Sequence, residues 1–229
     1  MSKKAIATEA DGTMSTKDKV LHSAAVMFLE RGYEKTSIRE IADHAGVNRG
    51  SVLFAIKSKE HLLCMLVAYV LESQFETSKK LVAGKTADPV LYYAVETALQ
   101  LYMAESSEAV RELYAVAYSL PSTSELIYRM VTEKLELIFK AYNPGWKAQD
   151  FYEREIATGS IIRGYMAKPC DHSFTIERKL RAFLETSLTI YHVPQEKTEE
   201  AFRFVCSLDF ETIAKKAVED MVSYLKEKI

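Results

Sequence analysis

The sequence predicts an all-helical protein. Only 8 Gly and 5 Pro occur in 229 residues, and so few helix breakers favour helices over a turn-rich sheet protein. Apolar residues also recur at helical spacing in one segment after another. Hydrophobic residues make up 48% of the chain and charged residues 27%, the balance of a chain that buries its own core. The length allows one large domain, or a small domain joined to a larger one.

The first helix is predicted over residues 17–31. Ser15 or Thr16 can cap its start, and Gly32 follows where a left-handed residue commonly ends a helix. Residues 1–16 contain no apolar run and are predicted to form a disordered arm. The apolar stripe of the helix consists of Val20, Leu21, Ala24, Ala25, Phe28 and Leu29.

Two short helices joined by a tight turn are predicted next. Ser37 and Glu40 have the spacing of a capping box, which begins the first of them. Gly46 ends this helix, and Asn48 can cap the second, over residues 49–56. Helix, glycine turn and helix in this spacing specify a helix-turn-helix; an ordinary pair of packed helices is the alternative. The small core between the helices is Ile41, Val47, Val52 and Ile56.

Helical patterning continues through the remaining chain. A long helix is predicted over residues 58–83, and Gly84 and Asp88-Pro89 separate it from the next. No apolar run reaches the roughly 18 residues that a membrane span needs. Seven further helices are predicted between Ser, Pro, Asn-Pro-Gly and Asp breakers, at 89–105, 107–119, 122–142, 148–168, 175–192, 195–207 and 210–228.

Charge is distributed unevenly along the chain. Residues 17–63 carry eight Lys/Arg and six Asp/Glu, whereas residues 64–229 carry 20 Lys/Arg and 24 Asp/Glu. This mild asymmetry fits a small DNA-contacting head on an acidic body.

The N-terminal motifs occur in a specific order between Ala24 and Leu63. They are Phe28, Gly32-Tyr33, Thr36-Ser37-Ile38, Ile41-Ala42, Ala45-Gly46-Val47, Gly50-Ser51-Val52 and Lys57-Ser58-Lys59-Glu60-His61-Leu62-Leu63. This stretch closely resembles the N-terminal domain of the tetracycline-repressor (TetR) family of transcriptional regulators. The remaining residues resemble that family only in length and helical character.

The resemblance implies a ligand-responsive regulator, usually a repressor, which binds a pseudo-palindromic DNA operator as a homodimer in the cytoplasm. It divides the chain into a DNA-binding domain at 17–63 and a ligand-binding and dimerisation domain at 64–229. In this family pattern the second short helix faces base edges, and the starts of its neighbours hold phosphates. The implied DNA-binding residues are Thr36, Ser37, Arg39, Asn48, Arg49, Gly50, Ser51, Leu53, Phe54, Lys57 and Lys59.

One segment departs from the family pattern. Positions 53–56 usually read Tyr-Tyr-His-Phe or similar, but here they are Leu53-Phe54-Ala55-Ile56. A tyrosine hydroxyl that commonly holds a phosphate and a histidine are therefore missing, although Leu53 can pack on a thymine methyl. The alternative function is a ligand-sequestering or protein-binding helical module with weakened DNA binding.

A tyrosine-rich stretch at residues 92–128 predicts a pocket for an unidentified small-molecule effector. Tyrosines supply apolar walls with polar tips, and methionines adapt to the shape of a ligand. Arg111 can pair with an acidic ligand, or with Glu108 or Glu112. Ordinary core packing is the alternative for each. The candidate ligand-binding residues are Tyr92, Tyr102, Met103, Arg111, Tyr114 and Tyr118.

Two of the later helices carry the candidate dimer interface. A seam of small residues on helix 148–168 allows close helix approach, and helix 175–192 has a broad apolar face. Core packing within one chain is the alternative for both. The candidate interface residues are Ala157, Ser160, Gly164, Ala167, Leu180, Phe183, Leu184, Ser187 and Tyr191.

Catalysis has no support in the sequence. The cysteines Cys64, Cys170 and Cys206 form neither a metal spacing nor a disulfide framework, which fits a reducing compartment. Cys170-Asp171-His172 lacks further ligands at metal spacing, and no phosphate loop or dinucleotide glycine pattern is present. We therefore expect no enzyme activity, no cofactor and no metal.

Overall fold

The computed structural model describes residues 15–227, apart from the side chains of residues 55 and 221–227, and this part of the chain is all-helical. Residues 1–14 of the expected N-terminal arm lie outside the described residues. Ser15 and Thr16 are instead the N-cap and the first residue of the first helix. The predicted fold class is confirmed, and every predicted helix is present with ends shifted by at most three residues.

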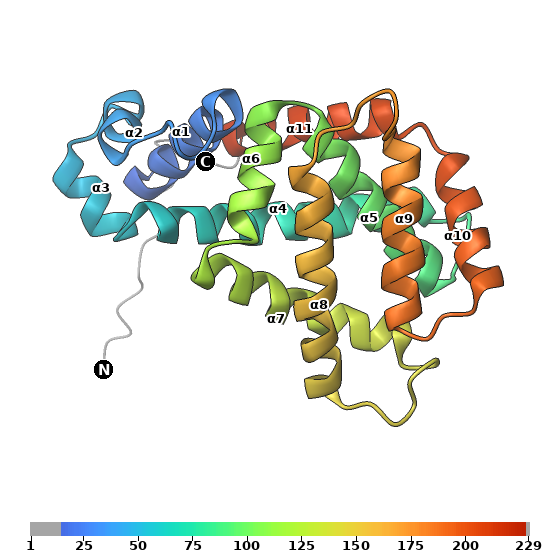
Figure 1. Cartoon of the computed structure of the whole chain (residues 1–229). Helices are drawn as coiled ribbons and strands as arrows, with labels where there is room; N and C mark the ends of the chain where they lie inside the picture. The colour runs from blue at the N-terminus through green and yellow to red at the C-terminus, as the bar shows by residue number, and fades with distance from the viewer. Residues whose placement is uncertain (1–14, 228–229) are drawn as a thin grey trace, which may run out of the picture.

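The helices form a head and a body (Figure 1). The head contains α1 (Thr16–Arg31), α2 (Ile38–Ala45) and α3 (Arg49–Ile56), and α4 (Lys59–Val82) runs from the head along the body. The body consists of α5 (Pro89–Glu105), α6 (Glu108–Ala117), α7 (Pro121–Phe139), α8 (Ala148–Ala167), α9 (Ile176–Ile190), α10 (Gln195–Cys206) and α11 (Phe210–Glu227).

Short polar side chains begin the helices of the head, as the sequence predicts. Ser37 and Glu40 form a complete capping box at the start of α2, and Asn48 Oδ1 accepts a hydrogen bond from the Ser51 N–H at 2.8 Å. Ser58 caps α4 by accepting from the His61 N–H at 3.0 Å. These bonds satisfy amides that no helical carbonyl can reach.

The core of the body surrounds α5. This helix packs against α4 and against each helix from α6 to α11, and 13 of its residues are buried. A helix that is buried on all sides is apolar all round, and α5 follows this rule except for a few polar side chains such as Glu96 and Gln100. The head docks on this body through α1, which contacts α6 and α11.

A buried ion pair ties three helices of the body together. Lys179 of α9 is 0% exposed, and its ammonium contacts the Glu105 carboxylate at the end of α5 and the Lys168 carbonyl. Arg111 of α6 pairs with the same carboxylate at 3.0 Å. The sequence left Arg111 a choice between a ligand, Glu108 and Glu112, but the fold gives it Glu105, because the chain turn between α5 and α6 brings these two side chains together.

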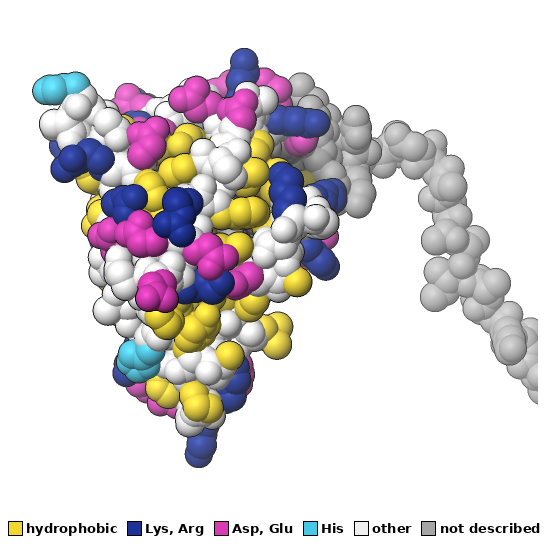
Figure 2. All heavy atoms as spheres, turned by 90° about the vertical axis from the view of Figure 1, so that its right-hand side faces the viewer, with side chains coloured by type: hydrophobic (Ala, Val, Ile, Leu, Met, Phe, Trp, Pro, Cys, Tyr) yellow, Lys and Arg dark blue, Asp and Glu magenta, His cyan; other side chains and the backbone are white. Residues whose placement is uncertain are grey.

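One face of the body is mixed in charge. Figure 2 shows one face, on which Lys/Arg and Asp/Glu side chains are interspersed with hydrophobic ones. The excess of acidic residues in the body therefore does not form a single-sign patch on this face. Within the described residues, no helix is both long and apolar enough to cross a membrane.

Candidate functional site

The α2–turn–α3 unit is held in shape by a small core and a left-handed glycine. Ile41, Val52 and Ile56 are completely buried between the head helices. Gly46 has φ +66° and ψ +31°, and its N–H is bonded to carbonyls in the last turn of α2. This left-handed conformation strains residues with a Cβ. The turn thus fixes α3 against α2 without using the outer face of α3.

The outer face of α3 is free for a partner. Arg49 is exposed in its first turn, Leu53 is 41% exposed, and Phe54 is 93% exposed. Leu53 and Phe54 are adjacent, so together they present apolar surface to a partner. Asn48 uses its carbonyl oxygen to cap α3, which leaves its NH2 group for a base or phosphate. The contacts of these residues with DNA stay a prediction.

Gly50 leaves room for the capping hydrogen bond of Asn48, and it also lies on the exposed surface of α3. A Cβ at this position would lie 3.3 Å from Asn48 Oδ1, which is close enough to disturb the capping hydrogen bond. Ser51 is half-buried, and Lys57 is exposed just after the end of α3. Gly50, Ser51 and Lys57 therefore lie along the same short helix as the expected base-reading residues.

Thr36 and Ser37 differ in their access to a phosphate. Thr36 is 1% exposed, and its hydroxyl donates to the Gly32 carbonyl at 2.8 Å. Its side chain thus stabilises the loop between α1 and α2 and is too buried to contact DNA. The prediction that the Thr36 side chain binds DNA is therefore corrected. Ser37 and Arg39 are exposed at the start of α2, so the expected phosphate contact there depends on them and on the helix amides.

Lys59 begins α4 at the joint between head and body. Its ammonium lies 3.9 Å from the centroid of the Tyr33 ring. Burial lowers its pKa, although the charges of Glu34, Glu112 and Glu40 act in the opposite direction. Lys59 is thus held in place by an aromatic ring and is half-buried, in contrast to the exposed Lys57.

We expect Lys59→Ala to weaken binding to all DNA sequences alike, because a lysine that contacts a phosphate carries no base information. The slope of log affinity against log salt concentration should become shallower by about 0.9, the value for one lost phosphate contact. Titrations of the variant at several salt concentrations measure this slope. Lys80→Ala, on the exposed far end of α4, is the matched control and should leave it unchanged. An unchanged slope in Lys59→Ala would overturn the phosphate assignment.

Two carboxylates, Glu112 and Glu60, connect the head to the body. Glu112 of α6 accepts a hydrogen bond from the Glu34 N–H at 2.8 Å, and it lies where a Cβ on Gly32 would be, at a residue with φ +91°. Glu60 accepts hydrogen bonds from Ser122 at the start of α7. The loop that leads into the DNA-binding helices is therefore bonded directly to α6.

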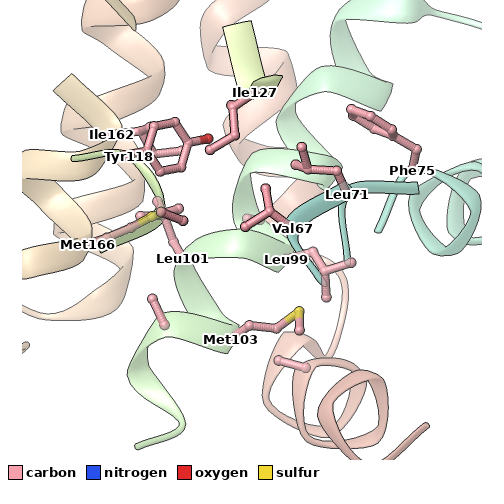
Figure 3. Close-up of a cluster of buried hydrophobic side chains, with 14 of the residues drawn as sticks. Val67, Leu71, Phe75, Leu99, Leu101, Met103, Tyr118, Ile127, Ile162 and Met166 are labelled. Carbon is pink, nitrogen blue, oxygen red and sulfur yellow. The ribbon is translucent and has the colours of Figure 1, made fainter. Parts of the chain in front are cut away.

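An apolar cavity of about 50 Å³ lies where α1, α4, α5, α6 and α7 meet. Figure 3 shows part of its wall, in which Val67, Leu71, Met103, Tyr118 and Ile127 belong to one cluster of buried side chains. The remaining lining residues are Leu29, Leu63, Leu66, Val70, Val110, Leu113, Tyr114 and Ala117. Because Leu29 belongs to α1, the cavity touches the head as well as the body.

The structure separates the candidate ligand-binding residues. Met103, Tyr114 and Tyr118 line this cavity. Tyr92 donates to the Phe75 carbonyl at 3.2 Å, and Tyr102 stacks on Phe210 beside a surface groove; neither lines the cavity. The sequence analysis missed Leu29 and the lining residues of α4, since their apolar periodicity is the same as that of an ordinary core.

The two helices of the candidate dimer interface differ in their exposure to solvent. Ala157, Ser160, Gly164 and Ala167 form an exposed stripe on α8, and the stripe is therefore open to a second copy. The residues of α9 are buried inside their own chain, so their assignment to the interface is corrected: they pack in the core of the body. These residues are Leu180, Phe183, Leu184, Ser187 and Tyr191.

Two acidic side chains, Glu96 and Glu155, are buried in the body. Burial raises the pKa of Glu96 to about 7, against a hydrogen bond from Gln100 and the charge of Lys134. Burial raises the pKa of Glu155 to about 8, against a hydrogen bond from Thr158, with the charge of Glu96 acting in the same direction as burial. Both carboxyls therefore hold their protons at mildly acidic pH.

These raised pKa values predict that stability falls as pH rises from about 5 to 8, because the unfolded chain loses these protons first. Glu155→Gln should make this fall shallower, since an amide does not titrate. Urea unfolding of both proteins across that pH range measures the free energy of unfolding. Glu133→Gln, at an exposed position of α7, should behave as the unchanged protein. Parallel curves for the Glu155 variant and the unchanged protein would contradict the prediction.

No three His, Cys, Asp or Glu side chains gather as a metal site within the part of the chain that the structure describes.

Comparisons with known proteins agree with the geometry of the head. A family model described as bacterial regulatory proteins of the tetR family matches residues 20–64. The regulator YttP of Bacillus subtilis strain 168 is 27% identical over 160 residues, which cover 69% of this chain and 72% of YttP. The transcriptional repressor KstR2 of Mycobacterium tuberculosis is 36% identical over 101 residues, or 44% of this chain and 47% of KstR2.

Solved structures share the fold of most of the chain. RolR in complex with resorcinol has a TM-score of 0.65 at 15% identity, covering 82% of this chain and 92% of RolR. SmeT, the repressor of a Stenotrophomonas maltophilia multidrug efflux pump, has a TM-score of 0.55 at 17% identity, covering 78% and 91%. Identities this low show the fold alone. Residues 20–64 thus form an N-terminal domain of the TetR family of bacterial regulatory proteins, and most of the chain shares the helical fold of RolR and SmeT.

Proposed function

We propose that the protein is a ligand-responsive transcriptional repressor that binds a pseudo-palindromic operator as a homodimer. Residues 17–63 would read the DNA, and residues 64–229 would bind the effector and the second copy. The observation that carries this proposal is the outer face of α3, where Arg49, Leu53 and Phe54 are exposed on a helix whose other face is fully buried. Two such helices in a dimer would enter successive major grooves.

The apolar residues of α3 suggest how it reads sequence despite the missing tyrosine hydroxyl. Thymine carries a methyl group in the major groove, which apolar side chains contact. Leu53 and Phe54 would select thymine, and Arg49 would select guanine. Operators with T next to G are therefore expected.

The dimer would form through the exposed stripe of α8. Small residues permit two α8 helices to approach closely, and Ile156, which is 40% exposed, adds an apolar contact beside the stripe. KstR2 and SmeT are named as repressors, which supports repression as the sign of regulation.

The effector response would depend on the joint between α1 and α6. The cavity is lined by Leu29 of α1 and by Val110 and Leu113 of α6, and Glu112 of α6 bonds the loop before α2. A ligand that fills the cavity would displace α6 relative to α1 and so change the position of the head. It needs about 1.4 kcal/mol of differential affinity for each tenfold loss of operator affinity.

Selection of binding sites from random DNA with the full chain tests this function. We expect one enriched motif with two inverted half-sites, bound by a dimer, as light scattering of the complex would show. Recovery of no motif would contradict the proposal and favour the alternative, a ligand-sequestering or protein-binding module.

We expect Glu112→Ala to loosen the head without unfolding the body. The Glu34 amide loses its acceptor, at a cost of about 1.5 kcal/mol, the lower end for a hydrogen bond to a charged group. Hydrogen exchange should therefore speed up at Glu34 and in the loop around it. Glu133→Ala, an exposed carboxylate of α7, is the control. Unchanged protection of the Glu34 amide would contradict the role of Glu112 as the head clamp.

A further inference from the structure

Gln74 of α4 has a buried polar atom without a partner. The side chain is 3% exposed. Its Nε2 donates to the Tyr114 hydroxyl and lies 3.5 Å from Met103 Sδ, but no described residue bonds its buried Oε1. An unpaired buried polar group costs about 1–3 kcal/mol, so a leucine would be the more stable choice here if packing were the sole requirement.

The unpaired position does not depend on how the amide is oriented. If oxygen and nitrogen were exchanged, Oε1 would accept from the Tyr114 hydroxyl, and Nε2 would become the atom without a partner. The site therefore offers either an acceptor or a donor. A hydroxyl group can satisfy both, since it donates one hydrogen bond and accepts others.

Gln74 lies at the end of the apolar cavity. It lines a small annex together with Val70 and Met103, and these two residues also line the main cavity. The annex and the cavity thus share a wall, and one of its members is a flexible methionine that can shift to join them. The main cavity of about 50 Å³ is smaller than the roughly 150 Å³ that holds a benzene ring, so a ring-sized molecule enters only if α6 moves away from α1. Such a molecule can then extend a polar group across the shared wall to Gln74.

The walls exclude a charged ligand. No described residue that lines the main cavity or the annex is charged, and the main cavity is apolar apart from the hydroxyls of Tyr114 and Tyr118. A charge placed among these side chains would lose its hydration without gaining a counter-ion. Arg111, the candidate partner for an acidic ligand, pairs with Glu105 and does not line the cavity.

We propose that the effector is a neutral, mainly apolar molecule with one hydroxyl group, which bonds the Gln74 amide while the apolar part fills the cavity beside α1. This proposal rests on the proposed function, because it names the chemistry of the effector. It also assigns to Gln74 the selection of that effector, a role that the apolar walls cannot perform.

Three probes of nearly equal shape test the proposal in the full chain without DNA. They are para-cresol, para-xylene, in which a methyl replaces the hydroxyl, and the anion para-toluate. Calorimetric titration should show that para-cresol binds about tenfold more tightly than para-xylene, as one added hydrogen bond allows, and that para-toluate does not bind. Equal affinity of cresol and xylene, tighter binding of toluate, or no binding of cresol at millimolar concentration would overturn the proposal.

Variants of Gln74 locate the hydrogen bond. Gln74→Leu should reverse the order, so that para-xylene binds more tightly than para-cresol, and Gln74→Met repeats the test with a more adaptable side chain. Tyr114→Phe, which removes the neighbouring hydroxyl, should retain the preference for cresol. If the Gln74 variants keep this preference, or if Tyr114→Phe loses it, the assignment to Gln74 is wrong.

The DNA readout separates the two proposals. Where cresol binds and lowers operator affinity in the unchanged protein but not in Gln74→Leu, both proposals are supported. Binding with the predicted order of probes but without any effect on DNA supports the ligand chemistry and contradicts the effector role.

Discussion

Lys179→Met is expected to lower the free energy of unfolding by about 3 kcal/mol, the lower end of what the loss of one partner of a buried ion pair costs. Lys179 is completely buried, and its ammonium is bonded to Glu105 and to the Lys168 carbonyl. Without it, the Glu105 carboxylate loses its most buried counter-charge. Arg111 remains bonded to Glu105, and this keeps the expected loss from being larger. Chemical unfolding of the full chain measures the change.

Two further variants control this prediction. Arg129→Ala breaks the Arg129–Glu125 pair, whose side chains are 76% and 42% exposed, and should lower the stability much less than Lys179→Met, because solvent screens an exposed pair. Adding Glu105→Gln to Lys179→Met should lower the stability further, since Arg111 then loses its remaining counter-charge. Equal losses of unfolding free energy in Lys179→Met and Arg129→Ala would show that the buried pair stabilises the fold no more than the exposed one.

The same pair predicts a dependence on pH. Burial alone would raise the pKa of Glu105, but hydrogen bonds from Lys179 and from the Cys170 N–H, with the charges of Lys179 and Arg111, hold it below its usual value. A carboxyl with a lowered folded pKa stabilises the fold above its unfolded pKa and loses this effect as pH falls. The difference between the unchanged protein and Lys179→Met should therefore shrink in acid.

Arg49→Ala should relax base preference at one position of each operator half-site by about 1–3 kcal/mol, or roughly 5- to 150-fold. Arg49 is exposed in the first turn of α3, the part of a recognition helix that reaches base edges. Its guanidinium can donate two hydrogen bonds to one guanine. Titration of the variant against the selected operator and each single-base change of it measures the preference.

The controls for Arg49→Ala distinguish base contact from phosphate contact. Lys57→Ala, at the other end of α3, should weaken binding to all sequences alike. The thermal unfolding midpoint of Arg49→Ala should stay unchanged, since the side chain is exposed and no packing is lost. A uniform loss of affinity in Arg49→Ala, with a shallower salt slope, would place its guanidinium on a phosphate.

Much of the fold follows from the sequence because helix ends are local events. Ser37 and Asn48 cap their helices in the structure as their spacing predicts, and Gly46 takes the left-handed conformation that ends α2. Each of these depends on residues within four positions along the chain. The boundaries of the helices and the exposed face of α3 could therefore be predicted without knowledge of any partner.

Longer-range assignments needed the tertiary structure. Periodicity tells which face of a helix is buried but not against what, since a core and an interface bury the same residue types. Phe183 and Tyr191 were therefore placed in an interface, although they pack inside their own chain. Periodicity could not predict that Leu29 and Gln74 line cavities, because a cavity forms only where several helices meet.

The sequence by itself determined the helices of the described residues, the helix-turn-helix and the family of the N-terminal domain, because these depend on caps, turns and local spacing. The tertiary structure alone decided that the Thr36 side chain is buried, that Arg111 pairs with Glu105, and that the cavity joins α1 to α6. The physical reason is distance along the chain: partners that lie far apart in sequence are chosen by the packing of the whole molecule.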